Sequence, residues 1–122
     1  MNSMSPLSRP PVVSQEDIVT TLMIGRTVRD ARKSAGLKQT ALQAQLGLRS
    51  TSFLPQVEHG KIVPSLDMAA KLEKALAIPP HSIASLVIKY RLQEQTAMLM
   101  HEAQERGIDV QVRLMFTERR KR

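Results

Sequence analysis

Residues 37–61 read LKQTALQAQLGLRSTSFLPQVEHGK, and this stretch decides the fold. Leu42 and Leu46 stand four residues apart, a spacing that places both side chains on one face of a short helix over residues 39–46. Gly47 then ends the helix, because glycine readily adopts the left-handed backbone conformation found at helix C-termini. The stretch therefore begins with a short helix and a turn.

A second short helix is predicted between Ser50 and Gly60. The hydroxyl groups of Ser50 and Thr51 can accept hydrogen bonds from the free N–H groups at a helix start. Leu54 and Val57 supply apolar positions, and Gly60 ends the helix. A helix, a turn and a second helix that starts with small polar residues form a shape that reads double-stranded DNA.

The composition argues against several other kinds of protein. The 122 residues have room for one compact domain with tails, and the absence of cysteine excludes disulfides, thiolate metal sites and cysteine nucleophiles. No apolar run approaches the roughly 20 residues of a membrane helix, so we expect a soluble, cytoplasmic and nucleoid-associated protein. His59, His81 and His101 lack metal-ligand spacing, and no nucleotide-binding or nucleophile motif appears. We expect no enzyme activity, no catalytic residues, no metal and no cofactor.

The net charge of +7 favours a polyanionic partner over a basic surface that only confers solubility. The cations gather around the two-helix stretch, where only Asp30 and Glu58 oppose them. These cations are Arg26, Arg29, Arg32, Lys33, Lys38, Arg49 and Lys61. Proteins that grip single strands stack bases on several aromatic rings, whereas this chain has one tyrosine, two phenylalanines and no tryptophan. Double-stranded DNA is therefore the expected partner.

Three further helices are predicted from apolar spacing and capping residues. The first runs from a capping box at Ser14 and Asp17 to about Ser34. Its expected apolar side consists of Ile18, Leu22, Ile24, Val28 and Ala31. Ser65 begins the helix that follows the central pair, and Pro79 ends it. Its expected buried side consists of Leu66, Ala69, Leu72, Leu76 and Ile78.

The last predicted helix begins near His81 or Ser82 and runs to Arg106, before Gly107. Its first turns can cover the core, with Ile83, Leu86, Val87 and Tyr90. Its later apolar residues lie beyond anything that one chain has left to cover, and we expect them to contact another chain. These later residues are Leu92, Met98, Leu99, Met100 and Ala103.

Residues 108–116 alternate apolar and polar side chains as far as Leu114, which predicts a single β-strand. A lone strand has unpaired backbone groups, and pairing with the same strand of a second copy about a two-fold axis satisfies them. Pairing with Val12 and Val13, or a frayed helix, is the alternative. The expected dimer interface comprises Leu92, Leu99, Val110, Val112 and Leu114.

The chain therefore divides into four parts. Residues 1–13 are a flexible leader rich in serine and proline, and residues 14–80 are the helix-turn-helix domain. Residues 81–116 form a dimerisation region of one helix and one strand. Residues 117–122 are a basic tail, which either grips DNA phosphates or only confers solubility.

Residues 24–78 resemble the DNA-binding domain of the phage repressor and Cro family, also called XRE-type regulators. The matching positions are Ile24, Gly25, Val28, Arg29, Gly36, Leu37, Gln39, Leu42, Leu46, Gly47, Val57, Glu58, Gly60, Lys61, Pro64, Ser65, Leu66, Lys71, Leu72, Ala75 and Leu76. The resemblance implies a mainly α fold, a five-helix repressor-like bundle that binds operators as a homodimer and regulates transcription. No membrane contact is implied.

The resemblance also implies roles for individual residues. Thr51, Ser52 and Gln56 would face base edges, since glutamine pairs with adenine and hydroxyl groups donate or accept hydrogen bonds. Contacts to the DNA backbone would come from Gln39, Lys38, Arg49, Ser50 and Lys61, and Ser50 would also cap the second helix. Arg32 and Glu58 would form an ion pair that ties the first helix to the end of the second helix of the motif.

Three departures from the family pattern affect the reading end of the motif. An extra residue sits near Leu48 and Arg49, Gln43 stands where the family keeps a small residue, and Pro55 falls where the family has a helical residue. A register change that places Ala44 at the helix contact is one explanation. We favour an enlarged turn, with the helix starting at residues 50–52 and the proline in its first turn.

Two functions fit this sequence. The first is a sequence-specific, double-stranded DNA-binding transcription regulator, a repressor, that acts as a homodimer on an inverted-repeat operator. The alternative is a protein-interaction module, antitoxin-like or an adaptor, whose helix-turn-helix has lost base reading. The departures at Gln43 and Pro55 favour the alternative, and the surrounding cations favour the regulator.

Overall fold

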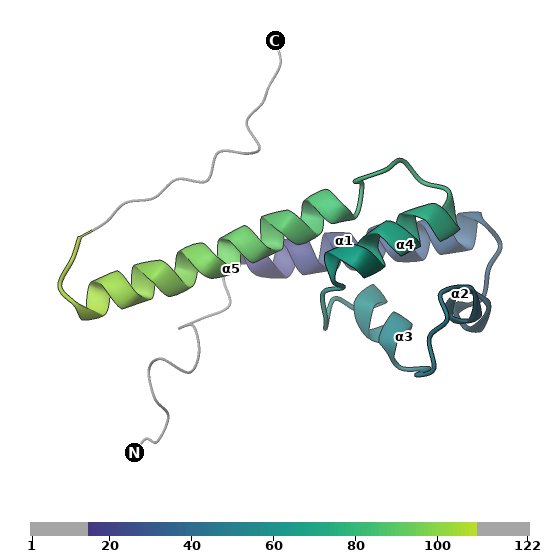
Figure 1. Cartoon of the computed structure of the whole chain (residues 1–122), viewed down its shortest axis with the longest axis horizontal. Coiled ribbons are helices and arrows are strands. Elements are labelled where there is room, and N and C mark those ends of the chain that lie inside the picture. The colour runs from purple at the N-terminus through teal and green to yellow at the C-terminus, as the bar shows by residue number, and fades with distance from the viewer. Residues whose placement is uncertain (1–14, 110–122) are drawn as a thin grey trace, which may run out of the picture.

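The computed structural model describes residues 15–109, with side chains from residue 17 onward. This part of the chain is helical and contains α1 (Gln15–Ser34), α2 (Gln39–Gln45), α3 (Phe53–Glu58), α4 (Leu66–Leu76) and α5 (Ala84–Glu105) (Figure 1). The mainly helical architecture predicted from the sequence is therefore confirmed over the described region. α2 and α3 are the two helices of the central stretch.

The predicted strand falls almost entirely outside the described residues. Ile108 and Asp109 are the two members of the 108–116 segment that the structure describes, and neither lies in a strand. The strand and its pairing across a dimer remain predictions. The leader, Ser14, the basic tail and the expected interface residues Val110, Val112 and Leu114 also lie outside the described residues.

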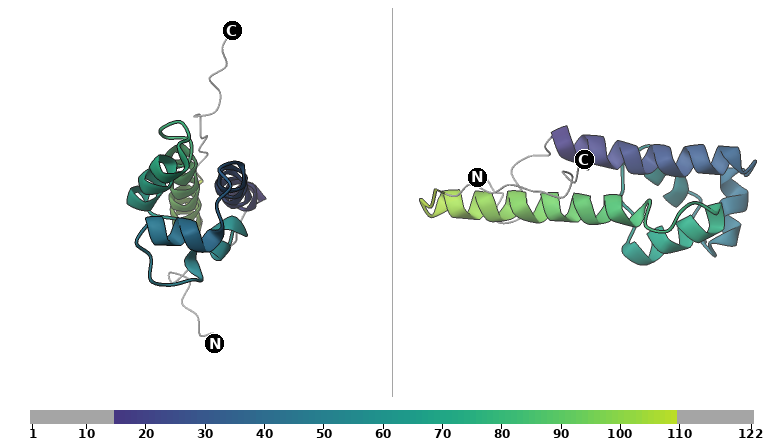
Figure 2. Two further views of the ribbon diagram at one scale, coloured as in Figure 1. Left: turned by 90° about the vertical axis from the view of Figure 1, so that its right-hand side faces the viewer. Right: turned by 90° about the horizontal axis from the view of Figure 1, so that it is seen from above.

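One hydrophobic core joins all five helices. α1 and α5 run side by side in opposite directions, with α2, α3 and α4 gathered at one end of the pair (Figure 2). The core residues are Ile24, Val28, Leu42, Leu54, Val57, Ala69, Leu72, Leu76, Ile83 and Val87. Because Ile83 and Val87 belong to this same core, the first turns of α5 cover it as expected, and the division of the chain at residue 80 stays a prediction.

The predicted buried side of α1 was partly wrong. Ile18 and Leu22 are 46% and 51% exposed, while the buried face carries Thr20, Ile24 and Val28. The side chains of Ile18 and Ile24 are six residues apart and cannot share one helix face, since a helix turns once in 3.6 residues. Leu66, also predicted to be buried, is 49% exposed because it stands at the first position of α4, where the helix has only begun to face the core.

The connection between α4 and α5 depends on a buried carboxylate. Glu73 of α4 accepts backbone N–H bonds from His81 at 2.9 Å and from Ile83 and Ala84 at 2.8 Å each. α5 consequently begins at Ala84, later than the predicted start at residues 81–82. Burial by itself raises the pKa of the Glu73 carboxyl, but the three backbone donors and nearby His81 outweigh it, and the pKa lies below its ordinary value.

Ser65 caps α4 as predicted, since its hydroxyl accepts the N–H of Met68 at 3.1 Å. The helix ends at Leu76, and the left-handed φ of 55° at its C-cap residue Ala77 turns the chain toward the two prolines. No helix within residues 15–109 has the length and apolarity needed to cross a bilayer. Over the same residues, no three metal-ligating side chains gather in one place.

Candidate nucleic-acid interface

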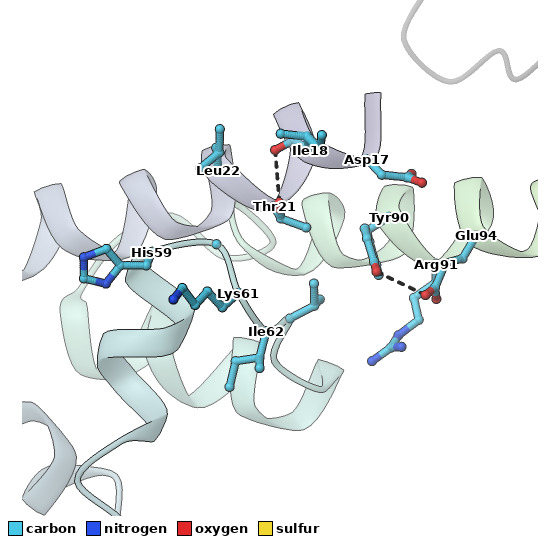
Figure 3. A pocket seen from close by; sticks show the side chains of 12 residues that line it. Asp17, Ile18, Thr21, Leu22, His59, Lys61, Ile62, Tyr90, Arg91 and Glu94 are labelled. Carbon is cyan, nitrogen blue, oxygen red and sulfur yellow. Dashed lines mark hydrogen bonds between the residues drawn. The ribbon is translucent and has the colours of Figure 1, made fainter. Parts of the chain in front are cut away.

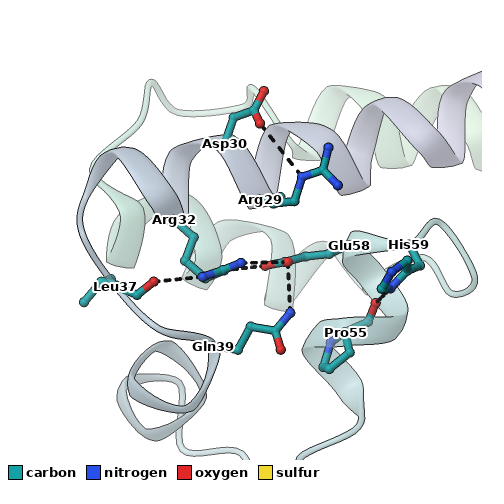
Figure 4. Close-up of polar contacts among 8 residues, drawn as sticks. All are labelled: Arg29, Asp30, Arg32, Leu37, Gln39, Pro55, Glu58 and His59. Carbon is teal, nitrogen blue, oxygen red and sulfur yellow. Dashed lines mark hydrogen bonds and ion pairs between the residues drawn. The ribbon is translucent and has the colours of Figure 1, made fainter.

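A buried ion pair holds α3 against α1. Arg32 Nε donates to Glu58 Oε2 at 2.7 Å, and Arg32 Nη2 donates to Glu58 Oε1 at 3.1 Å, so the contact is bidentate (Figure 4). Arg32 Nη1 also donates to the carbonyl oxygen of Leu37 at 2.8 Å, at the start of the link to α2. The hydrogen bond that Arg32 donates to Glu58 raises the pKa of Arg32, against the opposing effect of burial. The pair suggested by the sequence is therefore present.

Gln39 extends this contact to α2. Its amide nitrogen donates to Glu58 Oε1 at 3.0 Å, so one carboxylate joins side chains from α1, α2 and α3 (Figure 4). The amide group has a second N–H, which this bond does not use. Gln39 can therefore keep its bond to Glu58 and still donate to a phosphate, as expected from the sequence. The donor would be the second N–H of its side-chain amide or its backbone N–H at the start of α2.

α3 begins later than predicted, at Phe53 with Ser52 as the N-cap position. Pro55 is then the third helical residue, and the first intrahelical bond runs from the N–H of Gln56 to the carbonyl oxygen of Ser52 at 3.3 Å. The N–H groups of the first turn have no intrahelical acceptor, so proline at this position removes no helix bond. Pro55 is compatible with an intact α3.

The predicted cap at Ser50 was wrong. The Ser50 hydroxyl accepts the N–H of Ser52 at 3.1 Å and lies 2.9 Å from the Ser52 hydroxyl. It therefore binds the N–H of the N-cap residue and not an N–H group of the first turn of α3. The N-cap residue Ser52 itself makes no side-chain capping bond. The reason is the late start of α3, which moves the free N–H groups of the first turn beyond Ser50.

The turn between α2 and α3 spans residues 46–52, and the side chain of Gln43 faces it. Gln43 is buried and Ala44 is exposed, so the long side chain, not the small one, faces the turn. In the amide orientation that satisfies both of its ends, Gln43 Nε2 donates to the carbonyl oxygens of Ser50 and Thr51, each at 3.2 Å. Gln43 thus links α2 to the two residues, Ser50 and Thr51, that precede α3. This role of Gln43 was not predicted from the sequence. The signal was available, because Gln43 and the extra residue near Leu48 are two departures from the family pattern that lie close together.

The predicted base-reading residues lie together at the start of α3. Thr51 and Ser52 are exposed in the last two positions before the helix, and Gln56 is half-buried one helical turn further on. Lys38 and Arg49 are exposed on either side of α2 in the sequence, and these positions flank the same motif.

Lys61 lies apart from this group, beyond the far end of α3. It lines a groove of about 600 Å³ together with α1 and α5 residues that include Thr21, Tyr90 and Glu94 (Figure 3). Tyr90 donates its hydroxyl to Glu94 at 3.1 Å, and burial together with this carboxylate raises the pKa of Tyr90. Lys61, one of the backbone contacts suggested by the sequence, thus lies past the C-terminal end of α3, whereas Thr51 precedes its start.

Leu92 and Leu99, the described members of the expected dimer interface, are 40% and 63% exposed on α5. Helical periodicity puts them on one face with Ile88, while the buried Ile83 and Val87 occupy another side. Part of α5 therefore presents apolar side chains to solvent.

Residues 28–83 match the family described as Helix-turn-helix, a span that begins within α1 and includes all of α2, α3 and α4. This match supports the resemblance of the central helices to XRE-type helix-turn-helix domains. Families of this kind are DNA-binding domains of transcription regulators, and the matched residues include the exposed start of α3. No curated protein matches the chain.

Proposed function

We propose that the protein is a homodimeric transcription regulator, acting as a repressor, that reads a specific double-stranded DNA sequence with α3. The observation that carries the proposal is the exposed polar start of α3 on a rigid frame. Thr51 and Ser52 face solvent, while Arg32 and Glu58 fix the other end of the helix to α1. A frame of this kind holds a reading helix in place without using the side chains that would contact bases.

The chemistry of these side chains suits base edges in the major groove. A glutamine such as Gln56 can pair bidentately with adenine, and the hydroxyls of Thr51 and Ser52 can donate or accept. Pro55 lies between them in the first turn of α3 and stiffens the backbone there. Gln43 donates to the backbone carbonyl oxygens of Ser50 and Thr51, which favours a single backbone shape for the turn before α3.

Lys38, Arg49, Ser50, Gln39 and Lys61 would contact phosphates, which position the protein without specifying sequence. Lys38 and Arg49 are exposed and their charges are not engaged in any ion pair within the described residues. Their long side chains can therefore reach the DNA backbone on both sides of the groove.

A homodimer would place two copies of α3 in successive major grooves. The exposed apolar face of α5 with Leu92 and Leu99 supports such an assembly. In a monomer these side chains stay in water, whereas a dimer interface would bury them. Two half-sites would then lie about 34 Å apart, or a multiple of that, and form an inverted repeat.

The test is selection of a binding site from random duplexes, followed by titration of the selected duplex and of a scrambled duplex at several salt concentrations. We expect an inverted repeat, a preference for it of at least about a thousandfold, and a log–log salt slope of about −0.9 for each phosphate contacted. Equal affinity for the selected and scrambled duplexes would contradict base reading. Absence of any salt-dependent binding would instead favour a protein partner for the motif.

A further inference from the structure

The outward face of α1 is apolar along its first half. Ile18, Val19, Leu22 and Met23 are each between 45% and 53% exposed, on the side of the helix away from the buried Ile24. Four large apolar side chains within six residues form a continuous surface, and such a surface on a folded domain marks a contact site. The loop at Gly60 lies against one edge of this surface at Leu22, yet about half of the Leu22 side chain stays exposed.

The second half of this face is basic. A groove of about 400 Å³ runs from Val19, Leu22 and Met23 to Arg26 and Arg29. The groove also borders Glu58 and His59 of the α3 end, but the Glu58 carboxylate is occupied by Arg32 and Gln39. The nearest acid to Arg29 is Asp30, at 4.0 Å. The groove therefore offers apolar contacts at one end and positive charge at the other.

The end of α5 has the opposite character. Beyond Gln93 the helix has no buried residue, and it extends past the start of α1 (Figures 1 and 2). Met98 and Leu99 are 47% and 63% exposed, and Glu102 and Glu105 follow them. This end of α5 therefore carries two acids beside exposed apolar side chains, with Arg106 as the following residue, and α1 as the structure describes it does not reach this far.

The two surfaces have the same spacing. On α1, Val19 is followed by Leu22, Met23, Arg26 and Arg29, at intervals of three, four, seven and ten residues. On α5, Gln95 is followed at the same intervals by Met98, Leu99, Glu102 and Glu105. If the two helices pack side by side in the same direction, apolar side chains meet apolar side chains and the two acids meet the two arginines.

Within one chain this packing is impossible. α1 and α5 of the same copy run in opposite directions, and the end of α5 points away from the basic half of α1 (Figure 2). A second copy related by a two-fold axis across α5 supplies the required direction, because its α5 runs antiparallel to the first α5 and hence parallel to the first α1.

We propose that the acidic end of α5 of each copy docks on the apolar and basic face of α1 of the other copy. Because each copy contributes both an α1 face and an α5 end, the dimer contains this contact two times. This inference rests on the homodimer of the proposed function and specifies where the partner binds. Two exposed pairs inside α5, Glu102 with Arg106 at 3.5 Å and His101 with Glu105 at 3.4 Å, would be rearranged, and pairs of this exposed kind contribute little.

Charge reversal tests the contact in the full-length chain without DNA. The double variants Arg26→Glu/Arg29→Glu and Glu102→Arg/Glu105→Arg are each expected to raise the dimer dissociation constant about tenfold or more, measured by sedimentation equilibrium, because attraction becomes repulsion. The four substitutions combined in one chain should restore the wild-type constant. The matched control Lys33→Glu/Lys71→Glu changes the net charge equally at exposed sites outside the groove and should leave dimerisation unchanged.

Cross-linking gives a second readout, made clean by the absence of native cysteine. A chain with Met23→Cys and Leu99→Cys, which the shared spacing places opposite each other, should form a covalent dimer on mild oxidation, and neither single variant should. A dimer that keeps its constant in both charge variants, or a quadruple variant that is not restored, overturns the docking while leaving the homodimer and DNA reading intact. A wild-type chain that stays monomeric while still binding DNA overturns the docking and the homodimer together.

Discussion

The backbone of α1 at Gly25 lies directly against Glu58 at the end of α3. A Cβ atom added at residue 25 would be 2.5 Å from the carbonyl oxygen of Glu58 and 2.6 Å from that of Val57. Real Cβ atoms do not approach so closely, so α1 and α3 meet backbone to backbone at this point. The position of the proposed reading helix is therefore set partly by the absence of a side chain.

Gly25→Ala is expected to destabilise the domain by about 1–3 kcal/mol, because one of the two helices must shift. Replacing glycine by alanine in the middle of a helix normally stabilises a protein by about 0.5–1 kcal/mol. A decrease in the free energy of unfolding would therefore report the close contact at Gly25 and not the helix propensity. Urea denaturation measures the change, with Lys33→Ala, an exposed substitution on α1, as the control. An unchanged or higher midpoint for Gly25→Ala would mean that the close approach does not exist in solution.

The buried pair of Arg32 and Glu58 predicts a strong dependence between two substitutions. Arg32→Met leaves the Glu58 carboxylate buried with only Gln39 as donor, and we expect a loss of about 3–5 kcal/mol. Arg32→Met combined with Glu58→Leu should lose much less, since no unpaired charge then remains. A double-mutant cycle by chemical denaturation gives the coupling. Additive losses would show that the pair is not coupled.

Gln43 is expected to matter for DNA selectivity more than for stability. Gln43→Met keeps the length of the side chain but removes the donor that reaches Ser50 and Thr51, so the turn before α3 loses its fixed shape. Affinity for the selected duplex should fall about tenfold, and affinity for a scrambled duplex should not change. Gln45→Met, an exposed change on the same helix, is the control. Equal loss on both duplexes would assign Gln43 a purely structural role.

The buried Glu73 carboxylate is expected to make the free energy of unfolding depend on pH in the acidic range. Its pKa is lower in the folded domain than in the unfolded chain, so its stabilisation is fully present above the ordinary glutamate pKa and is lost as the pH falls through the folded-state pKa. Glu73→Gln should lower the free energy of unfolding at neutral pH by about 1–3 kcal/mol and flatten the acid limb. Asp30→Asn, an exposed change, should keep the wild-type slope. The measurement is denaturation at a series of pH values, and parallel slopes for wild type and Glu73→Gln would contradict the assignment.

Local patterns in the sequence were sufficient for the helices and most of the core. Leu42, Ala69 and Leu72 follow helical spacing, and they are buried as predicted. Ile18 and Leu22 misled the prediction because α1 carries two apolar faces, and the sequence does not say which one meets the core. The outer of these faces is the one that the proposed exchange of α5 ends would cover.

The residues that sequence reasoning missed act across the chain. Glu73 reaches backbone donors eight to eleven residues later, after the chain has turned back. A glutamate within a helix is normally predicted to face solvent. No short sequence motif indicates that Glu73 binds the backbone N–H groups around the start of α5. Gln43 likewise acts on the turn that follows its helix. Such contacts depend on the tertiary arrangement, which a single sequence does not reveal.

The central claim is that the polar start of α3 reads bases, and a comparison of Gln56→Ala with Lys38→Ala tests it most directly. Both variants are titrated against the selected duplex and against a panel with every single base-pair change. We expect Gln56→Ala to cost about 1–3 kcal/mol on the selected duplex and to abolish the preference at one base pair in each half-site. Lys38→Ala should weaken binding to all duplexes alike. An equal loss across the whole panel for Gln56→Ala would contradict base reading by α3.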